Sequence, residues 1–205
     1  MAETRPAILL DVDGPLNPFA DSETPRAPGY RAHLLRPEIF PGRPAENRTV
    51  WLDPAHGRQL LELAAETQAD LVWATLWEHE ANRLLTVPLG LPHLEVIAFD
   101  GTAFRHANGH HAKLPGITAW AGTRPLVWFD DQFQPGDEDW AVDRSRDTAP
   151  TRIVPIDPSI GLAAADLDNA RDFLLRHQRA QALTRLGEMA DRGEFDEYLT
   201  GPRAE

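Results

Sequence analysis

The chain has 205 residues, of which 42% are hydrophobic and 25% are charged, and these proportions predict one globular domain with a hydrophobic core. Its formal net charge of −12 argues against a protein that binds long nucleic acids, and no segment approaches the roughly 18 apolar residues of a membrane span. Because the sequence has no cysteine and no signal peptide, disulfides and thiolate chemistry are excluded and we expect a cytoplasmic location.

The first quarter of the chain predicts a strand, an irregular insert and the start of a helix. A buried strand is expected at residues 7–12, which open with four consecutive hydrophobic residues. Residues 15–52 are rich in Pro, Gly and Arg, and we expect an irregular flap with short extended pieces at residues 30–35 and 49–52. A helix should begin at residues 53–54, where a capping Asp precedes a Pro.

The rest of the chain continues to alternate strands with helices. In order, we expect a strand at residues 70–76, a short helix at 78–85 that ends before Pro88, a strand at 94–99, a short helix at 115–121, a strand at 125–129, an acidic surface helix or loop at 137–146, a strand at 152–156 and a helix at 163–177. Beyond it we expect a second helical stretch at residues 179–199, after a break, with Gly187 and Gly193 as its weak points. This alternation predicts an α/β fold with a doubly wound, mostly parallel sheet.

Paired carboxylates follow two of the expected strands. Asp11 and Asp13 end the first strand, and Asp130 and Asp131 follow the strand at residues 125–129. In parallel sheets, ligands bind beyond the carboxyl ends of the strands, so neighbouring strands would bring all four acids to one edge. Because like charges repel, a cation should lie among them, and Mg²⁺ with its preference for oxygen ligands is the natural candidate.

These residue types can perform phosphoryl transfer. Asp11 can attack a phosphorus centre and form an aspartyl-phosphate, while Asp13 can protonate the leaving oxygen and then activate water. Gly14 lets the backbone turn away and keeps the approach of the substrate clear. Thr75 offers a hydroxyl to a phosphoryl oxygen, and Lys113 offsets the repulsion between the nucleophile and the transferring group. Lys113 is also the only lysine among 20 basic residues.

This set of residues, in this order, resembles the motifs of the haloacid dehalogenase (HAD) superfamily of phosphohydrolases. The four matching motifs are the Asp11-Val12-Asp13-Gly14 run, Thr75, Lys113 and the Asp130-Asp131 pair. The resemblance spans roughly residues 7–160 and implies a Rossmann-like sheet with Mg²⁺ bound by Asp11, the Asp13 carbonyl and Asp130, and Asp131 is a further candidate for the Mg²⁺ shell. In having both Asp11 and Asp13, the chain resembles the phosphatases of this superfamily rather than the dehalogenases, which lack the second acid.

Cap insertions decide the substrate in this superfamily, and this chain resembles a minimal-cap member. We expect one HAD-like hydrolase domain over residues 1–205, with a small flap at 15–52 and C-terminal helices at 163–199. The open site that this implies suits either a bulky phosphorylated substrate or a promiscuous phosphatase. The acidic surface favours a small phosphorylated substrate, with a nucleic-acid end as the second choice and no membrane partner; the oligomeric state is left open. The stretch from residue 73 to 79 also resembles phosphatase modules linked to RNA repair.

Several further residues lie near the expected site. Trp77, Glu78 and Asn82 follow Thr75 closely and are candidates for substrate contacts, whereas Trp73 is expected in the core. The histidines of the loop before Lys113 are expected to be solvated rather than metal ligands: His106, His110 and His111.

Two other classes of protein use similar residues. A phospho-accepting signalling domain also needs an acidic pair, a Thr and a Lys, but there the pair follows the first strand and the acceptor Asp follows the third. Here the acidic pair follows the fourth strand, which disfavours that interpretation. A catalytically idle binding domain is disfavoured because every motif is present. Measuring whether phosphate release depends on Mg²⁺ distinguishes the phosphatase, the signalling domain and the binding domain.

Overall fold

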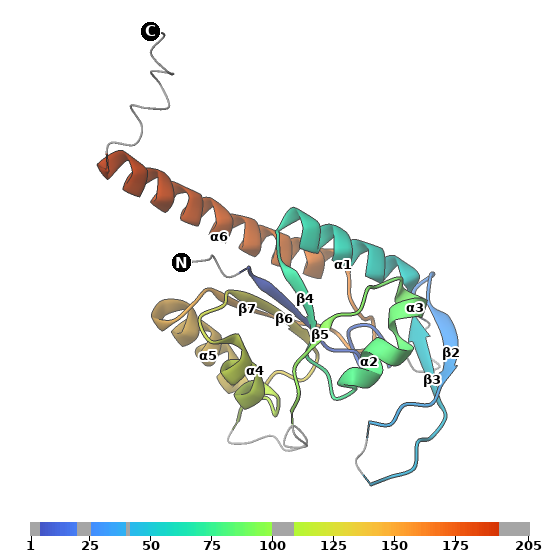
Figure 1. Cartoon of the computed structure of the whole chain (residues 1–205). Coiled ribbons are helices and arrows are strands. Elements are labelled where there is room, and N and C mark those ends of the chain that lie inside the picture. Colours follow the sequence, from blue (N-terminus) through green and yellow to red (C-terminus); the bar gives the residue numbers. More distant parts are fainter. Residues whose placement is uncertain (1–4, 20–25, 40–41, 100–108, 193–205) are drawn as a thin grey trace.

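A five-stranded parallel sheet forms the centre of the protein (Figure 1). The computed structural model describes residues 5–19, 26–39, 42–99 and 109–192. In spatial order the strands are β5 (Glu95–Val96), β4 (Asp70–Trp73), β1 (Ala7–Leu10), β6 (Leu126–Asp130) and β7 (Thr151–Pro155). All four neighbouring pairs are parallel, which confirms the predicted sheet.

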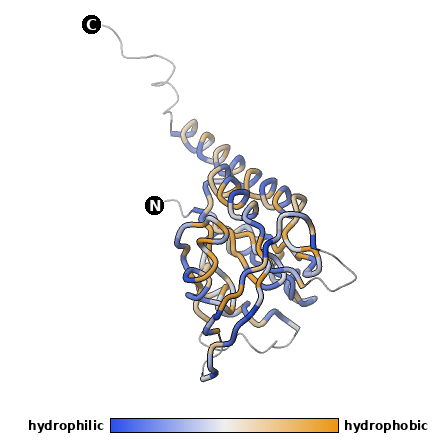
Figure 2. Tube along the Cα trace, turned by 90° about the vertical axis from the view of Figure 1, so that its right-hand side faces the viewer, coloured by the Kyte–Doolittle hydropathy of each residue, from blue (hydrophilic) through white to orange (hydrophobic). Residues whose placement is uncertain are grey.

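Helices cover both faces of this sheet, as a doubly wound fold requires. They are α1 (Pro54–Glu66), α2 (His79–Leu84), α3 (Thr86–Leu89), α4 (Leu114–Ala121), α5 (Pro135–Asp147) and α6 (Ala164–Asp191). Ile8 and Leu10 of β1 pack in one core cluster with α1 and α6, while Ala7 and Leu9 face the opposite way, toward α4. Figure 2 shows the hydrophobic segments gathered at these inner layers. No helix in the described ranges has the length and apolar character of a membrane span.

The register of the central strands brings their carboxyl ends to one edge. Leu10 of β1 pairs with Trp73 of β4 on one side and with Phe129 of β6 on the other. The chain leaves β1 toward β4 and later returns to β6, so the strand order reverses beside β1. Ligands of doubly wound sheets bind at this reversal, and residues that directly follow these three strands therefore lie close together.

A two-stranded antiparallel hairpin occupies part of the expected flap. It is formed by β2 (Arg31–Leu35) and β3 (Arg48–Leu52), close to the extended pieces predicted from the sequence. Val50 and Leu52 are buried and belong to the same core cluster as α1. Figure 1 shows the hairpin beyond the strands on the side away from the N-terminus, which places it near their carboxyl ends.

One expected helix end is confirmed and another is wrong. The helix expected at residues 78–85 ends before Pro88, since α2 covers His79–Leu84. A separate short helix that was not expected, α3, contains Pro88, whose missing N–H has no intrahelical partner to lose in a four-residue helix. A break was expected between residues 177 and 179, with Gly187 as a weak point of the helix that follows, yet α6 runs without interruption from Ala164 through Gly187 to Asp191. A single exposed glycine costs a helix only about 1 kcal/mol, which its neighbours offset; Gly193 lies outside the described residues.

Gly57 of α1 is required by a close approach of α3. A Cβ atom at this position would overlap the backbone carbonyl of Leu89, whereas a Cβ at Gly187 of α6 would meet nothing within 4 Å. We expect Gly57→Ala to lower the free energy of unfolding by about 1–3 kcal/mol, the cost of overpacking. Gly187→Ala is the matched control and should not lower it, because alanine favours a helix. Urea denaturation measures both, and equal midpoints for the two variants would contradict the proposed packing.

Candidate active site

Three aspartates meet at the carboxyl edge of the sheet. Asp11 follows β1, Asp130 ends β6 and Asp131 comes directly after it, and one carboxylate oxygen of each lies within 4.8 Å of the others. We call these residues the aspartate cluster. Asp11 and Asp130 are buried and Asp131 is half-buried. The sequence predicted this convergence, and the geometry is that of a candidate site for a hard cation.

Lys113 compensates part of the charge of the aspartate cluster. It immediately precedes α4, and its Nζ lies 2.7 Å from Oδ2 of Asp11 and 2.8 Å from Oδ2 of Asp130. Burial disfavours the charged ammonium, but the two carboxylates act more strongly and raise the pKa of Lys113 above its usual value. Lys113 therefore carries a positive charge between Asp11 and Asp130.

The three carboxyl groups differ in their proton affinity. Burial raises the pKa of Asp11 to about 7 against the opposing charge of Lys113, and burial together with the charge of Asp130 raises the pKa of Asp131 to about 6. Burial also raises the pKa of Asp130, but Lys113 and the hydrogen bond from His111 outweigh it, and the net shift is downward. Asp130 thus holds its negative charge most firmly.

The oxygens of Asp130 are fully occupied by donors from the protein. Oδ1 accepts hydrogen bonds from His111 Nε2 at 2.9 Å and from the Gln132 N–H at 3.0 Å. Oδ2 accepts from Lys113 Nζ at 2.8 Å and from Trp128 Nε1 at 3.2 Å. A carboxylate offers about four acceptor positions, so these bonds leave little room for a further ligand.

Asp131 is in the opposite situation. Its Oδ1 is buried and has no hydrogen-bond partner in the described part of the chain. Gly14 lies against this carboxyl group with a φ of +91°, and a Cβ atom at Gly14 would come within 2.5 Å of Asp131 Cγ. The Asp-x-Asp-Gly run thus needs glycine at its last position both for its backbone conformation and for the space that Asp131 occupies.

His111 is a site residue that the sequence analysis missed. It was expected in a solvated loop, but its side chain is buried against Trp128, with ring centroids 4.9 Å apart. Its Nδ1 accepts a hydrogen bond from the Lys113 N–H at 3.0 Å, so the proton of the neutral ring lies on Nε2 and is donated to Asp130. His111 therefore fixes both the backbone before α4 and the orientation of Asp130.

Asp137 supports His111 from the start of α5. The segment was expected at the surface, yet Asp137 is completely buried. Its carboxylate accepts hydrogen bonds from the His111 N–H at 3.0 and 3.1 Å and from the Gln134 N–H at 2.8 Å, and His110 Nδ1 lies 3.4 Å from it. The spacing of Gln134 and Asp137 is a capping signal that predicts the helix start, but it does not predict the contact with His111.

Asp13 is held by two side chains. Asn17 Nδ2 donates to Oδ1 at 2.8 Å, and the indole Nε1 of Trp77 donates to Oδ2 at 2.9 Å. Trp77 was expected near the entrance of the site, but it is buried, and its polar atom is directed at Asp13. Thr75 is buried after β4, where its Oγ1 accepts from the Trp77 N–H at 3.3 Å.

The two remaining candidates bond to the scaffold. Glu78 Oε1 accepts from the Phe99 N–H at 3.0 Å. Asn82 Oδ1 accepts from Trp73 Nε1 at 3.0 Å and from the Leu94 N–H at 2.9 Å, and its Nδ2 donates to the Leu94 carbonyl at 2.8 Å. Asn82 thus fastens α2 to β4 and to the segment before β5, and the substrate contact expected of it has no support. His106 lies outside the described residues.

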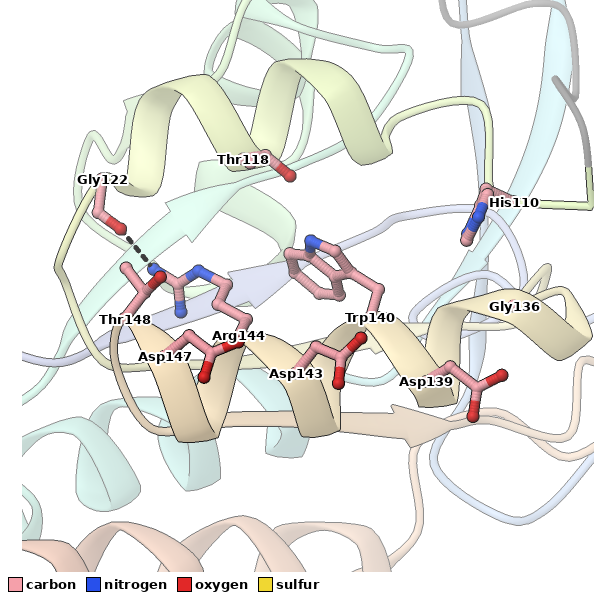
Figure 3. A pocket seen from close by; sticks show the side chains of 10 residues that line it. All are labelled: His110, Thr118, Gly122, Gly136, Asp139, Trp140, Asp143, Arg144, Asp147 and Thr148. Atoms are coloured by element: carbon pink, nitrogen blue, oxygen red, sulfur yellow. Dashed lines mark hydrogen bonds between the residues drawn. The ribbon is translucent and has the colours of Figure 1, made fainter.

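A groove of about 600 Å³ lies between α4 and α5, apart from the aspartate cluster (Figure 3). Trp140 of α5 points across it toward Thr118 of α4. At one end, the buried Arg144 donates to the Gly122 carbonyl at 2.8 Å, so this cation serves to hold the two helices together. At the other end His110 lines the groove, and its Nδ1 lies 3.4 Å from the carboxylate of the buried Asp137.

One comparison with known proteins found a match. A family model described as the HAD domain in Swiss Army Knife RNA repair proteins matches residues 7–167. Searches of curated proteins and of solved structures found no match. The matched range includes the aspartate cluster, Lys113 and the hairpin.

We expect Asn82→Ala to destabilise the protein by about 2–4 kcal/mol, because two buried N–H donors lose their acceptor. Thermal denaturation measures the change, and Thr118→Val, which removes a half-buried hydroxyl from α4, is a control for a small polar loss. An Asn82→Ala protein as stable as the wild type would show that the amide is not needed by the fold.

Proposed function

The chain belongs to the family of HAD domains in Swiss Army Knife RNA repair proteins, and from this membership we propose that it is a Mg²⁺-dependent phosphatase. It would hydrolyse a phosphomonoester through an aspartyl-phosphate intermediate on Asp11. The observation that carries the proposal is the placement of the Asp11 carboxylate, buried at the reversal of strand order and 2.7 Å from the Lys113 ammonium. This combination provides a nucleophile together with a fixed positive charge for the phosphoryl group.

The reaction proceeds in two steps. An oxygen of Asp11 attacks phosphorus, the bond from phosphorus to the ester oxygen breaks, and Asp13 gives its proton to that leaving oxygen. In the second step Asp13 takes a proton from water, whose oxygen attacks the phosphorus of the aspartyl-phosphate and releases inorganic phosphate and the free Asp11 carboxylate. Asn17 and Trp77 hold Asp13 during both steps through their bonds to its two oxygens.

The residues present fit a divalent cation. Among the described acids, only the aspartate cluster brings three carboxylates together, and the buried Oδ1 of Asp131 has no other partner there. We assign Asp11 and Asp131 as the carboxylate ligands, with Asp130 as the residue that holds Lys113 and His111. When bound, Mg²⁺ would neutralise negative charge on the phosphoryl oxygens.

The family description changes the order of the expected substrates. A small phosphorylated molecule was the first choice from the sequence, but membership in a family of RNA repair proteins favours the phosphorylated end of an RNA strand. An end phosphate is a phosphomonoester, so the chemistry assigned to Asp11 and Asp13 applies to it without change.

Asp11→Asn should lower the hydrolysis of p-nitrophenyl phosphate by about 10³-fold or more, because the amide is a far weaker nucleophile. Asp130 still pairs with Lys113 in this variant, so circular dichroism should show a folded protein. Asp139→Asn on the exposed side of α5 is the matched control and should behave as the wild type. Phosphate release that survives in Asp11→Asn, or that persists in EDTA, would exclude the proposed mechanism.

We expect Asp131→Asn and Asp130→Asn to change different properties of the protein, the first its Mg²⁺ requirement and the second its stability. The first should raise the Mg²⁺ concentration needed for half-maximal activity by at least about tenfold, because it weakens a metal ligand. The second should mainly lower the melting temperature, because an amide nitrogen cannot accept the hydrogen bonds that Asp130 receives. Activity titrated with Mg²⁺ and thermal denaturation of both variants test the assignment, and the reverse pattern would make Asp130 the ligand.

A further inference from the structure

The Lys113 ammonium is divided between two carboxylates. Its Nζ lies 2.7 Å from Asp11 Oδ2 and 2.8 Å from Asp130 Oδ2. An ammonium has three N–H donors, so one remains for an oxygen of the phosphoryl group. If Asp130 released its share, Lys113 would turn a second donor to Asp11, whose Oδ1 already accepts the Val12 N–H at 2.8 Å. The lone pairs that attack phosphorus would then be occupied, so the reaction depends on the orientation of Asp130.

Asp130 is held between Lys113 and His111. Its Oδ2 accepts from Lys113, and its Oδ1 accepts from His111 Nε2 at 2.9 Å. The two further donors belong to the same strand and the turn after it: Trp128 Nε1 at 3.2 Å and the Gln132 N–H at 3.0 Å. Among the donors that the structure describes, only His111 and Lys113 reach Asp130 from another segment of the chain. His111 therefore holds the carboxylate from the side opposite the ammonium.

The ring of His111 has a fixed position of its own. His111 is only 3% exposed, and its ring lies edge-on to Trp128 and Phe133, with centroids 4.9 and 5.9 Å away. Its backbone N–H donates to the buried carboxylate of Asp137 at 3.0 and 3.1 Å. A donor that is held by packing and by a hydrogen bond behind it has one direction, which is what orients the group it binds.

The tautomer of His111 is fixed by Lys113 itself. Nδ1 accepts from the Lys113 N–H at 3.0 Å, so the neutral ring carries its proton on Nε2 and presents a donor to Asp130. The three hydrogen bonds among His111, Asp130 and Lys113 thus form a closed ring. The segment that carries the ammonium also fixes the donor that orients the partner of that ammonium.

We propose that His111 is a positioning residue of the phosphatase reaction, and that its Nε2–H group sets the place of the Lys113 ammonium between Asp11 and Asp130. His111 acts through these residues and transfers no proton. The inference rests on the proposed function for the reaction that Lys113 assists, and it adds the group that keeps an N–H donor free for the phosphoryl oxygen.

Two substitutions each keep one half of the His111 ring. The side-chain nitrogen of glutamine reaches about as far as Nε2 and can donate to Asp130, whereas the oxygen of asparagine lies near the place of Nδ1 and can accept from the Lys113 N–H. At saturating Mg²⁺, kcat for p-nitrophenyl phosphate should fall by about 10–100-fold in His111→Asn and by no more than about threefold in His111→Gln, with KM unchanged in both. A fully active His111→Asn protein, or a folded His111→Gln protein as impaired as His111→Asn, would overturn the proposal.

Phe133→Leu is the control for packing. The Phe133 ring contacts both His111 and Trp128, but it makes none of the hydrogen bonds to Asp130. The smaller side chain should lower the melting temperature, because it leaves a cavity beside the His111 ring, and kcat below that temperature should stay at the wild-type value. A loss of kcat in Phe133→Leu as large as that in His111→Asn would show that packing alone matters and would refute the role of the Nε2–H donor.

A measurement on Lys113 separates this inference from the proposed function. Because Lys113 is the only lysine in the sequence, protein labelled with ¹⁵N at the lysine side chain gives one Nζ resonance and requires no turnover. This resonance should have the same position in the wild type and in His111→Gln, and it should shift and exchange faster with water in His111→Asn. That pattern supports the positioning role even if the wild type releases no phosphate. An unchanged resonance in His111→Asn beside an Asp11-dependent phosphatase would refute the role of His111 and leave the proposed function intact.

Discussion

The structure depends most on the charge balance around the Nζ of Lys113. Two buried carboxylates, Asp11 and Asp130, lie within hydrogen-bond distance of this one ammonium, and a third carboxyl group lies next to them. No arrangement of the three acids alone would be stable out of water, because each buried negative charge needs a partner. The parallel pairing of β1 with β6 brings Asp11 beside Asp130, and the position of Lys113 before α4 places its ammonium between them.

Adjacent residues in the acidic pair have different surroundings. The four hydrogen bonds to Asp130 tie it to the loop of His111, to β6 and to the following turn, so it organises the edge of the sheet. Asp131 keeps an oxygen without a partner among the described residues, at the point where Gly14 makes room. The two residues differ because Asp130 is the last residue of β6 and is buried, whereas Asp131 comes after the strand and is half-buried.

Much of this could be predicted from the sequence, because strand ends are local features with a fixed spatial meaning. Runs of hydrophobic residues ending in acids give the strands, and parallel pairing brings Asp11 and Asp130 together. His111 and Asp137 could not be predicted, since their contact joins a loop to a helix start 26 positions later, and neither residue belongs to a periodic pattern. Gly57 was missed for a similar reason: only the three-dimensional packing of α1 on α3 shows that the position has no room for a side chain.

The bridge made by Asn17 has a consequence for how such a domain can be altered. An insert at the edge of a catalytic sheet is ordinarily a module that can be shortened, lengthened or exchanged to change the substrate. Here the backbone of β3 supplies one of the two bonds that orient the Asn17 amide, and that amide in turn orients Asp13. Grafting a different insert onto this scaffold would therefore preserve turnover only if the new backbone presents an N–H group at the position of Trp51.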